Sequence, residues 1–188
     1  VPERMAAAVP NARLIYVLRD PIERALSHYR HNVSHGRETR SVEDAFSDLR
    51  DNHYVATSRY WEQAERFLRF FDRDQLLFVD FSELRTTPNA VLERIFSFVD
   101  VDPTFRHDAF GTVLHDSSQK GRPNALGRRI ATVPVVRQLR YAFPQVFEAP
   151  LDRPTLSAST HAALLDALGP DIEALRRESG LPLVAWTD

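Results

Sequence analysis

The chain has 188 residues, with 24 Lys and Arg against 26 Asp and Glu, which gives a formal net charge of −2. This charge excludes a strongly basic protein of the kind that binds nucleic acid or an anionic membrane over its whole surface. The absence of cysteine excludes disulfides, thiolate metal sites and cysteine nucleophiles. We expect one domain over residues 1–188, no nucleic-acid partner, and an anion site, if there is one, made by local charge.

The beginning of the chain gives expectations about location and completeness. No apolar run approaches the roughly 20 residues needed to span a bilayer, and Val1-Pro2-Glu3-Arg4 does not resemble a signal peptide. We therefore expect a cytoplasmic protein without a transmembrane segment. The chain starts without Met, close to its first strand, and we expect further sequence upstream. The sequence predicts no particular oligomeric state.

The first predicted elements are a short helix over residues 4–9 and a strand over 13–18. The strand is apolar and rich in β-branched and aromatic residues, which is typical of a parallel strand buried on both faces. A helix should follow at once, because Asp20 suits an N-cap, Pro21 suits the first turn, and Glu23 completes a capping-box pattern. This helix is predicted to end near His35, with Gly36 as its left-handed stop.

This strand-turn-helix segment contains the first candidate site. Arg19 comes at the carboxyl end of the strand, where open α/β sheets bind ligands. Ser27 is seven residues past the cap, which is about two turns or roughly 10 Å along the helix, on the same side as its start. A guanidinium fork and a hydroxyl on one face suit a phosphate. The alternative is that Arg19 pairs with an acid and that Ser27 only packs.

The same helix carries three histidines at steps of three and four residues, His28, His31 and His35, which share one face. A metal site is conceivable there. However, no carboxylate has matching spacing, and histidine near a helix C-terminus is favoured by the helix dipole in any case. The sequence therefore predicts no metal.

The next segments alternate in type. A second helix should run from Ser41 to about Leu49, and a third, capped by Thr57 or Ser58, should bury the apolar positions between residues 60 and 71. A second buried strand is predicted over residues 76–79, and Thr87-Pro88 begins another helix. Strand, helices, strand and helix in this order predict an α/β protein with a parallel sheet flanked by helices.

The second candidate site lies in a polar stretch near residue 120. Lys120, the only lysine in the chain, and Arg122 flank Gly121, so two cations surround a residue at which backbone can approach a ligand. The alternative is a solvated basic loop. Two further helices are predicted near residues 133–146 and 160–177, and neither carries recognisable chemistry.

These segments resemble the sulfotransferases that use 3′-phosphoadenosine 5′-phosphosulfate. Residues 19–29, Arg-Asp-Pro-Ile-Glu-Arg-Ala-Leu-Ser-His-Tyr, resemble the segment of that family in which an Arg and a Ser eight residues apart hold the 3′-phosphate. Residues 58–60, 76–80, 83–84, 88 and 95–99 follow in the family's order, so that the resemblance extends from residue 5 to about 103. Lys120-Gly121-Arg122 resembles the family's late nucleotide-binding loop.

The resemblance implies a P-loop NTPase-like sulfotransferase fold and the family's reaction. A sulfuryl group would pass from 3′-phosphoadenosine 5′-phosphosulfate, the cosubstrate, to a hydroxyl or amine of a small molecule, glycan or lipid, without an obligatory metal. The implied cofactor-binding residues are Arg19, Ser27, Lys120, Gly121 and Arg122.

Two parts of the family's machinery have no match in this sequence. The family places a Lys-containing loop for the 5′-phosphosulfate, and a Glu or His base, before the Arg-to-Ser segment, and only 18 residues precede Arg19 here. No Gly-x-x-x-x-Gly-Lys-Ser/Thr pattern occurs in the chain. We therefore expect a carboxyl-terminal portion of the domain, without the P-loop strand, and assign no catalytic residue; naming His53 or Glu83 as the base would be guesswork.

Three functions remain open at this point. The first is a sulfotransferase. The second is a non-catalytic remnant of that fold which binds a nucleotide or a partner protein, and the missing loop favours it. The third, a P-loop kinase or nucleotidase, is weaker because no Walker-type loop and no Mg²⁺-binding acid after a strand are found. Whether the 188-residue chain is active alone is a separate question, which its upstream sequence would help to answer.

Overall fold

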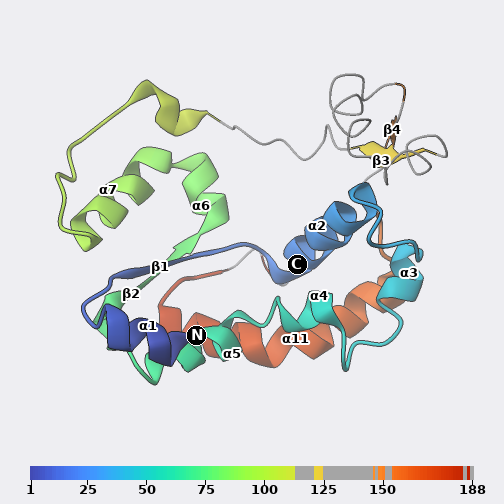
Figure 1. Ribbon diagram of the computed structural model, residues 1–188, viewed down its shortest axis with the longest axis horizontal. Helices are drawn as coiled ribbons and strands as arrows, with labels where there is room; N and C mark the ends of the chain where they lie inside the picture. Colours follow the sequence, from blue (N-terminus) through green and yellow to red (C-terminus); the bar gives the residue numbers. More distant parts are fainter. Residues whose placement is uncertain (113–120, 125–145, 147, 151–153, 184–185, 187–188) are drawn as a thin grey trace.

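The computed structural model describes residues 1–112, 121–124, 146, 148–150, 154–183 and 186, with the backbone alone at 121–123 and 148–150. Within these residues the chain forms helices and strands in the order shown in Figure 1. They are α1 (Pro2–Ala8), β1 (Leu14–Leu18), α2 (Pro21–Ser34), α3 (Val42–Ala45), α4 (His53–Ala56), α5 (Tyr60–Leu68), the 3-10 helix η1 (Arg73–Gln75), β2 (Leu76–Asp80), α6 (Phe81–Thr86), α7 (Pro88–Phe98), the 3-10 helix η2 (Asp108–Gly111), β3 (Gly121–Pro123), β4 (Glu148–Pro150) and α11 (Ala158–Ser179).

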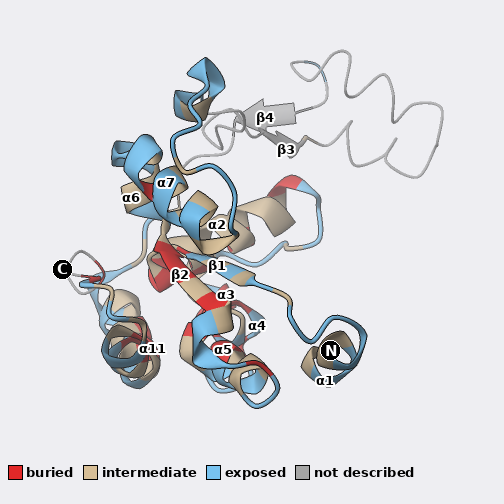
Figure 2. Ribbon diagram, turned by 90° about the vertical axis from the view of Figure 1, so that its left-hand side faces the viewer, coloured by how far each residue is buried: buried red, intermediate tan, exposed pale blue. Residues whose placement is uncertain are grey.

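The sheet confirms the predicted α/β class. β1 and β2 pair in parallel, with Leu14 opposite Leu76 and Leu18 opposite Asp80, and the segment between them contains four α-helices and the 3-10 helix η1. Figures 1 and 2 show α6 and α7 on one side of this sheet and α5 and α11 on the other. The short strands β3 and β4 form a separate antiparallel pair, with Gly121 opposite Pro150.

The prediction that the first strand is buried on both faces is wrong for the described part of the chain. Leu18 is fully buried, but the side chains that alternate with it, Ile15 and Val17, are 40% and 45% exposed. Because successive side chains of a strand point to opposite faces, β1 packs through Leu14, Tyr16 and Leu18 and presents its other face outward.

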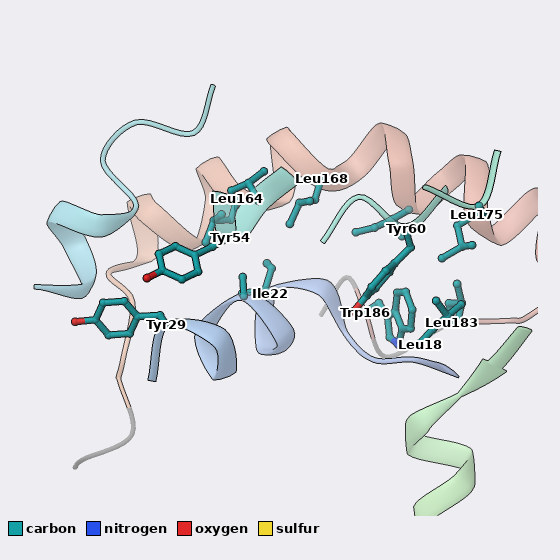
Figure 3. Close-up of a cluster of buried hydrophobic side chains, with 14 of the residues drawn as sticks. Leu18, Ile22, Tyr29, Tyr54, Tyr60, Leu164, Leu168, Leu175, Leu183 and Trp186 are labelled. Carbon is teal, nitrogen blue, oxygen red and sulfur yellow. The ribbon is translucent and has the colours of Figure 1, made fainter. Parts of the chain in front are cut away.

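The hydrophobic core lies on the packed face of β1 and is completed by α11. This helix places Leu164, Leu168, Ile172 and Leu175 on one stripe at steps of four, four and three residues, and each is at most 2% exposed. They pack against side chains of α2, α4 and α5 (Figure 3). Residues from the two ends of the chain thereby hold the candidate site in place.

Local signals set the boundaries of α2 as predicted. Asp20 is the N-cap, since its Oδ1 accepts a hydrogen bond of 2.7 Å from the Glu23 N–H, and Pro21 occupies the first turn. The helix ends at Ser34, and Gly36 follows with φ of +69°, in the left-handed region that glycine favours.

The helix predicted from Ser41 to Leu49 ends four residues earlier, at Ala45, and the separate helix α4 follows. The cause is the buried Asn52, whose amide nitrogen donates to the carbonyls of Ala45 and Asp48 at 2.8 and 3.0 Å. Its oxygen meanwhile accepts from the N–H groups of Tyr54 and Val55 and caps α4. One side chain therefore ends the first helix and begins the second.

The loop after α2 is organised around the carboxylate of Glu38. It accepts hydrogen bonds from Arg40 Nε at 3.1 Å, Arg40 Nη2 at 2.7 Å and the Tyr54 hydroxyl at 3.0 Å, and also from the N–H groups of Thr39 and Arg40. The bonds from Arg40 are the main reason that the pKa of Glu38 is lowered from 4.5 to about 2.

We expect Glu38→Gln to reduce the free energy of unfolding by about 1–2 kcal/mol at neutral pH, a value kept small because the partner Arg40 is exposed to solvent. A carboxylate whose pKa is lowered by folding stabilises the protein fully above its unfolded pKa of 4.5, and this stabilisation is lost as the pH falls toward 2. Urea unfolding of both proteins at several pH values checks this. The two stabilities should converge below pH 4.5, and a difference that stays constant with pH would contradict the prediction.

Candidate functional site

The candidate site begins where β1 ends. Leu18 is fully buried at the end of the strand, and Ile22 and Ala25 bury the first turns of α2, so the backbone of Arg19 is held between two anchored elements. The Arg19 side chain is 36% exposed. Its Nη2 donates to Glu23 Oε2 at 2.9 Å, so the carboxylate expected to complete a capping box is instead engaged by Arg19.

Ser27 lies farther along the same helix. Within α2, Glu23 and Ser27 are four residues apart and fall on one face of the helix, and Arg19, which precedes the N-cap Asp20, reaches this face through its bond to Glu23. Ser27 is partly exposed. The alternative interpretation of Arg19 is that it pairs with an acid, and its contact with Glu23 is such a pair. An exposed pair of this kind is weak, and it leaves the guanidinium accessible to a stronger anion.

The second candidate segment is described in part. The backbone of β3, which includes Gly121 and Arg122, packs against α2 although nearly a hundred residues separate them in the sequence. Figure 1 shows β3 and β4 beside the end of α2 that is farther from β1. Lys120 lies outside the described residues. The fold thus brings the backbone of two of the three loop residues to the helix that carries Ser27.

Arg24 joins α2 to the segment between α4 and α5, a contact that the sequence analysis missed. Its Nη1 donates to Thr57 Oγ1, and it lies 3.4 Å from both the Tyr54 carbonyl oxygen and Ser58 Oγ. Ser58, only 1% exposed, donates in turn to the Tyr54 carbonyl at 2.9 Å. A second arginine within residues 19–29 is the signal that could have suggested such an anchor, because an arginine on a packed helix face needs acceptors.

Two tyrosines, the partly buried Tyr16 and the buried Tyr60, lie on the packed side of the strand. The rings of Tyr16 and Tyr60 meet edge to face with centroids 5.8 Å apart. Burial, and next the carboxylate of Asp171, raise the pKa of Tyr16 to about 12, and burial also raises the pKa of Tyr60. Both hydroxyls therefore stay protonated at neutral pH and cannot act as a general base.

The three histidines of α2 do not converge. The rings of His31 and His35 are tilted by 34° with centroids 4.2 Å apart, whereas His28 packs against the rings of His53 and Tyr54, each at 5.1 Å. Burial lowers the pKa of His28, and the neighbouring charge of Arg24 lowers it further. Across the part of the chain that the structure describes, no three acidic or histidine side chains gather as metal ligands would.

The structure gives neither His53 nor Glu83 support as the catalytic base. Glu83 forms an ion pair with Arg94, whose Nη2 and Nη1 lie 2.7 and 3.3 Å from the two carboxylate oxygens. This pairing engages both oxygens of the Glu83 carboxylate. His53 is exposed and contacts His28. We therefore assign no catalytic base.

A hollow of about 710 Å³ lies at the other end of the sheet. It is lined by Asn11, Arg13, Asp72, Gln75 and Phe98, among others, near the start of β1 and β2. Ligands of open parallel sheets bind at the carboxyl ends of the strands. We therefore place the candidate site at Arg19 and not in this hollow.

None of the helices in the described ranges is both long and apolar enough to cross a membrane.

The fold and this site define an α/β protein with a strand-to-helix turn suited to an anion. Residues 4–122 match the sulfotransferase domain family, and the chain belongs to that family. Similar curated proteins include the bifunctional heparan sulfate N-deacetylase/N-sulfotransferase 2 of Homo sapiens, 34% identical over 146 residues, and that of Bos taurus, 33% identical over 147 residues. Each alignment covers 68% of this chain but 16% of the relative, so the chain spans about one sixth of these proteins.

A solved structure supports the fold. The sulfotransferase from Alicyclobacillus acidocaldarius aligns with a TM-score of 0.68 and 21% identity, over 100% of this chain and 62% of that one. This likeness confirms the sulfotransferase fold that the sequence predicted.

Proposed function

We propose that the protein to which this chain belongs transfers a sulfuryl group from 3′-phosphoadenosine 5′-phosphosulfate to a hydroxyl or amine. The observation that carries the proposal is Arg19, fixed at the carboxyl end of β1 between the buried Leu18 and the capped start of α2, and in contact with Glu23, which shares a face of that helix with Ser27. Membership of the sulfotransferase family supports it.

In this proposal the described residues bind and orient the nucleotide. Sulfuryl transfer resembles phosphoryl transfer, an in-line displacement that depends mainly on positioning and on cations near the negative oxygens. Arg19 and Ser27 would hold the 3′-phosphate through a charge-assisted fork and a hydroxyl donor. Lys120, the Gly121 backbone and Arg122 would complete the same phosphate site, as the resemblance to the family's late nucleotide-binding loop implies. β3 packs against α2, beside the end of that helix that is farther from Arg19 (Figure 1). No metal is needed for these contacts.

For the acceptor we propose a glycan. The names of the curated relatives describe N-sulfotransfer to heparan sulfate, so an amine on a glycan chain is the acceptor to test before a small molecule or a lipid. The cytoplasmic location expected from the sequence stays a prediction.

A non-catalytic nucleotide-binding protein is the second candidate. The observation that favours it is the absence of a glycine-rich Lys loop from the 188-residue sequence. Incubation of the protein to which this chain belongs with the sulfuryl donor and a heparan chain bearing free amino groups separates the two. Formation of adenosine 3′,5′-bisphosphate supports the transferase, whereas tight nucleotide binding without turnover supports the second candidate.

The charge pattern of the ligand provides a further prediction. Adenosine 3′,5′-bisphosphate should bind more tightly than adenosine 5′-monophosphate by about 30-fold to 1,000-fold, because the monophosphate lacks the group that Arg19 contacts. Mg²⁺ should change neither affinity much. Calorimetric titration of both nucleotides, with and without Mg²⁺, is the measurement. Stronger binding of ATP that requires Mg²⁺ would favour a kinase-like site instead.

A further inference from the structure

Glu23 lies between the two residues to which we assign the 3′-phosphate. It is four residues before Ser27, on the same face of α2, and Arg19, which precedes the N-cap of that helix, contacts it. Its Oε2 accepts a hydrogen bond of 2.9 Å from Arg19 Nη2. A negative group therefore stands at the centre of a site proposed to bind an anion.

A second carboxylate adds to the negative charge beside Arg19. Asp20, the N-cap of α2, is close enough to interact electrostatically with both Arg19 and Glu23. The backbone N–H of Glu23 already satisfies one oxygen of Asp20, and this bond fixes the Asp20 side chain in place. The positive charge of Arg19 is thus balanced by acidic neighbours before any nucleotide binds.

We infer that Glu23 sets the nucleotide affinity of this site by competing with the 3′-phosphate for Arg19. The inference rests on the proposed function. In the nucleotide-free protein the Glu23 carboxylate holds Arg19, and an arriving phosphate dianion takes its place. The donor and the spent nucleotide carry the same 3′-phosphate, so this competition weakens both and hastens departure of the product.

The geometry favours competition over a positioning role for Glu23. The two side chains are 36% and 43% exposed, and a pair this exposed is weak, so it is easily exchanged for a phosphate. The backbone of Arg19 is fixed independently, by Leu18 on one side and the Asp20 cap on the other. A carboxylate next to a dianion is also strongly repelled. Removal of the Glu23 charge should therefore help the phosphate more than the lost pairing harms it.

The test is Glu23→Gln, titrated with adenosine 3′,5′-bisphosphate in the 188-residue chain. Glutamine keeps the shape of the side chain and is a good residue for the first helical turn. We expect binding to become tighter by about threefold to tenfold, with slower dissociation in stopped-flow measurements, since one exposed competing charge is removed. Affinity for adenosine 5′-monophosphate should not change, because it has no 3′-phosphate.

Asp20→Asn is the matched control. It removes one negative charge beside Arg19 and keeps a good N-cap, but it leaves the Arg19–Glu23 contact intact. Asp20→Asn should gain clearly less affinity for adenosine 3′,5′-bisphosphate than Glu23→Gln does. Equal gains in both variants would mean a general field effect and would overturn the inference, and so would weaker or unchanged binding by Glu23→Gln. Failure of the parent to bind adenosine 3′,5′-bisphosphate would overturn the proposed function, and the inference with it.

Discussion

Arg19→Ala is expected to weaken the binding of adenosine 3′,5′-bisphosphate by about 2–4 kcal/mol, or roughly 30-fold to 1,000-fold, because a charge-assisted contact to phosphate is lost. The Arg19 side chain is 36% exposed, so its guanidinium is accessible to the phosphate. Ser27→Ala removes a single neutral donor and should weaken binding by only about 1 kcal/mol.

Arg66→Ala is the matched control for this experiment. Arg66 also pairs with a glutamate four residues away, Glu62, but it does so on α5 and with a more exposed side chain. Both alanine variants lose one arginine and one exposed ion pair, so their stabilities should be similar. Calorimetric titration should then show a large loss of affinity for Arg19→Ala alone. Equal affinity of Arg19→Ala and the parent would remove the central assignment.

The parts of the fold that the sequence predicted well are those set by neighbouring residues. The start of α2 depends on Asp20 and Pro21, and its end on Gly36, all within a turn of the boundary that they define. The position of Arg19 at the end of a parallel strand is also predicted correctly. An apolar run followed at once by an N-cap residue fixes where the strand ends and the helix begins.

Contacts between distant segments were out of reach of such reasoning. The amino end of α5 was expected to be capped by Thr57 or Ser58, but its N-cap is Arg59, which makes no capping bond through its side chain. The N–H groups of Trp61 and Glu62 donate instead to Asp171, 110 and 109 residues away. A remote carboxylate of this kind has no signature in the local sequence. The sequence of α2 likewise does not show which distant acceptors in the α4–α5 segment Arg24 reaches.

Leu18→Ala is expected to lower the free energy of unfolding by about 2–5 kcal/mol, the usual range for a buried leucine replaced by alanine. Leu18 is fully buried and belongs to the same cluster as Tyr60, Leu183 and Trp186 (Figure 3). Because the next residue is Arg19, a cavity at this point should also loosen the candidate site and reduce nucleotide affinity. Chemical denaturation and calorimetric titration measure the two effects.

Ile15→Ala, on the same strand, shows whether the open face of β1 is open in solution. Ile15 is 40% exposed, so removing most of its side chain should cost less than about 1 kcal/mol, and nucleotide affinity should stay the same. The contrast with Leu18→Ala follows directly from the alternation of side chains along a strand. A loss for Ile15→Ala as large as that for Leu18→Ala would mean that both faces of β1 are covered, as the apolar sequence of the strand first indicated.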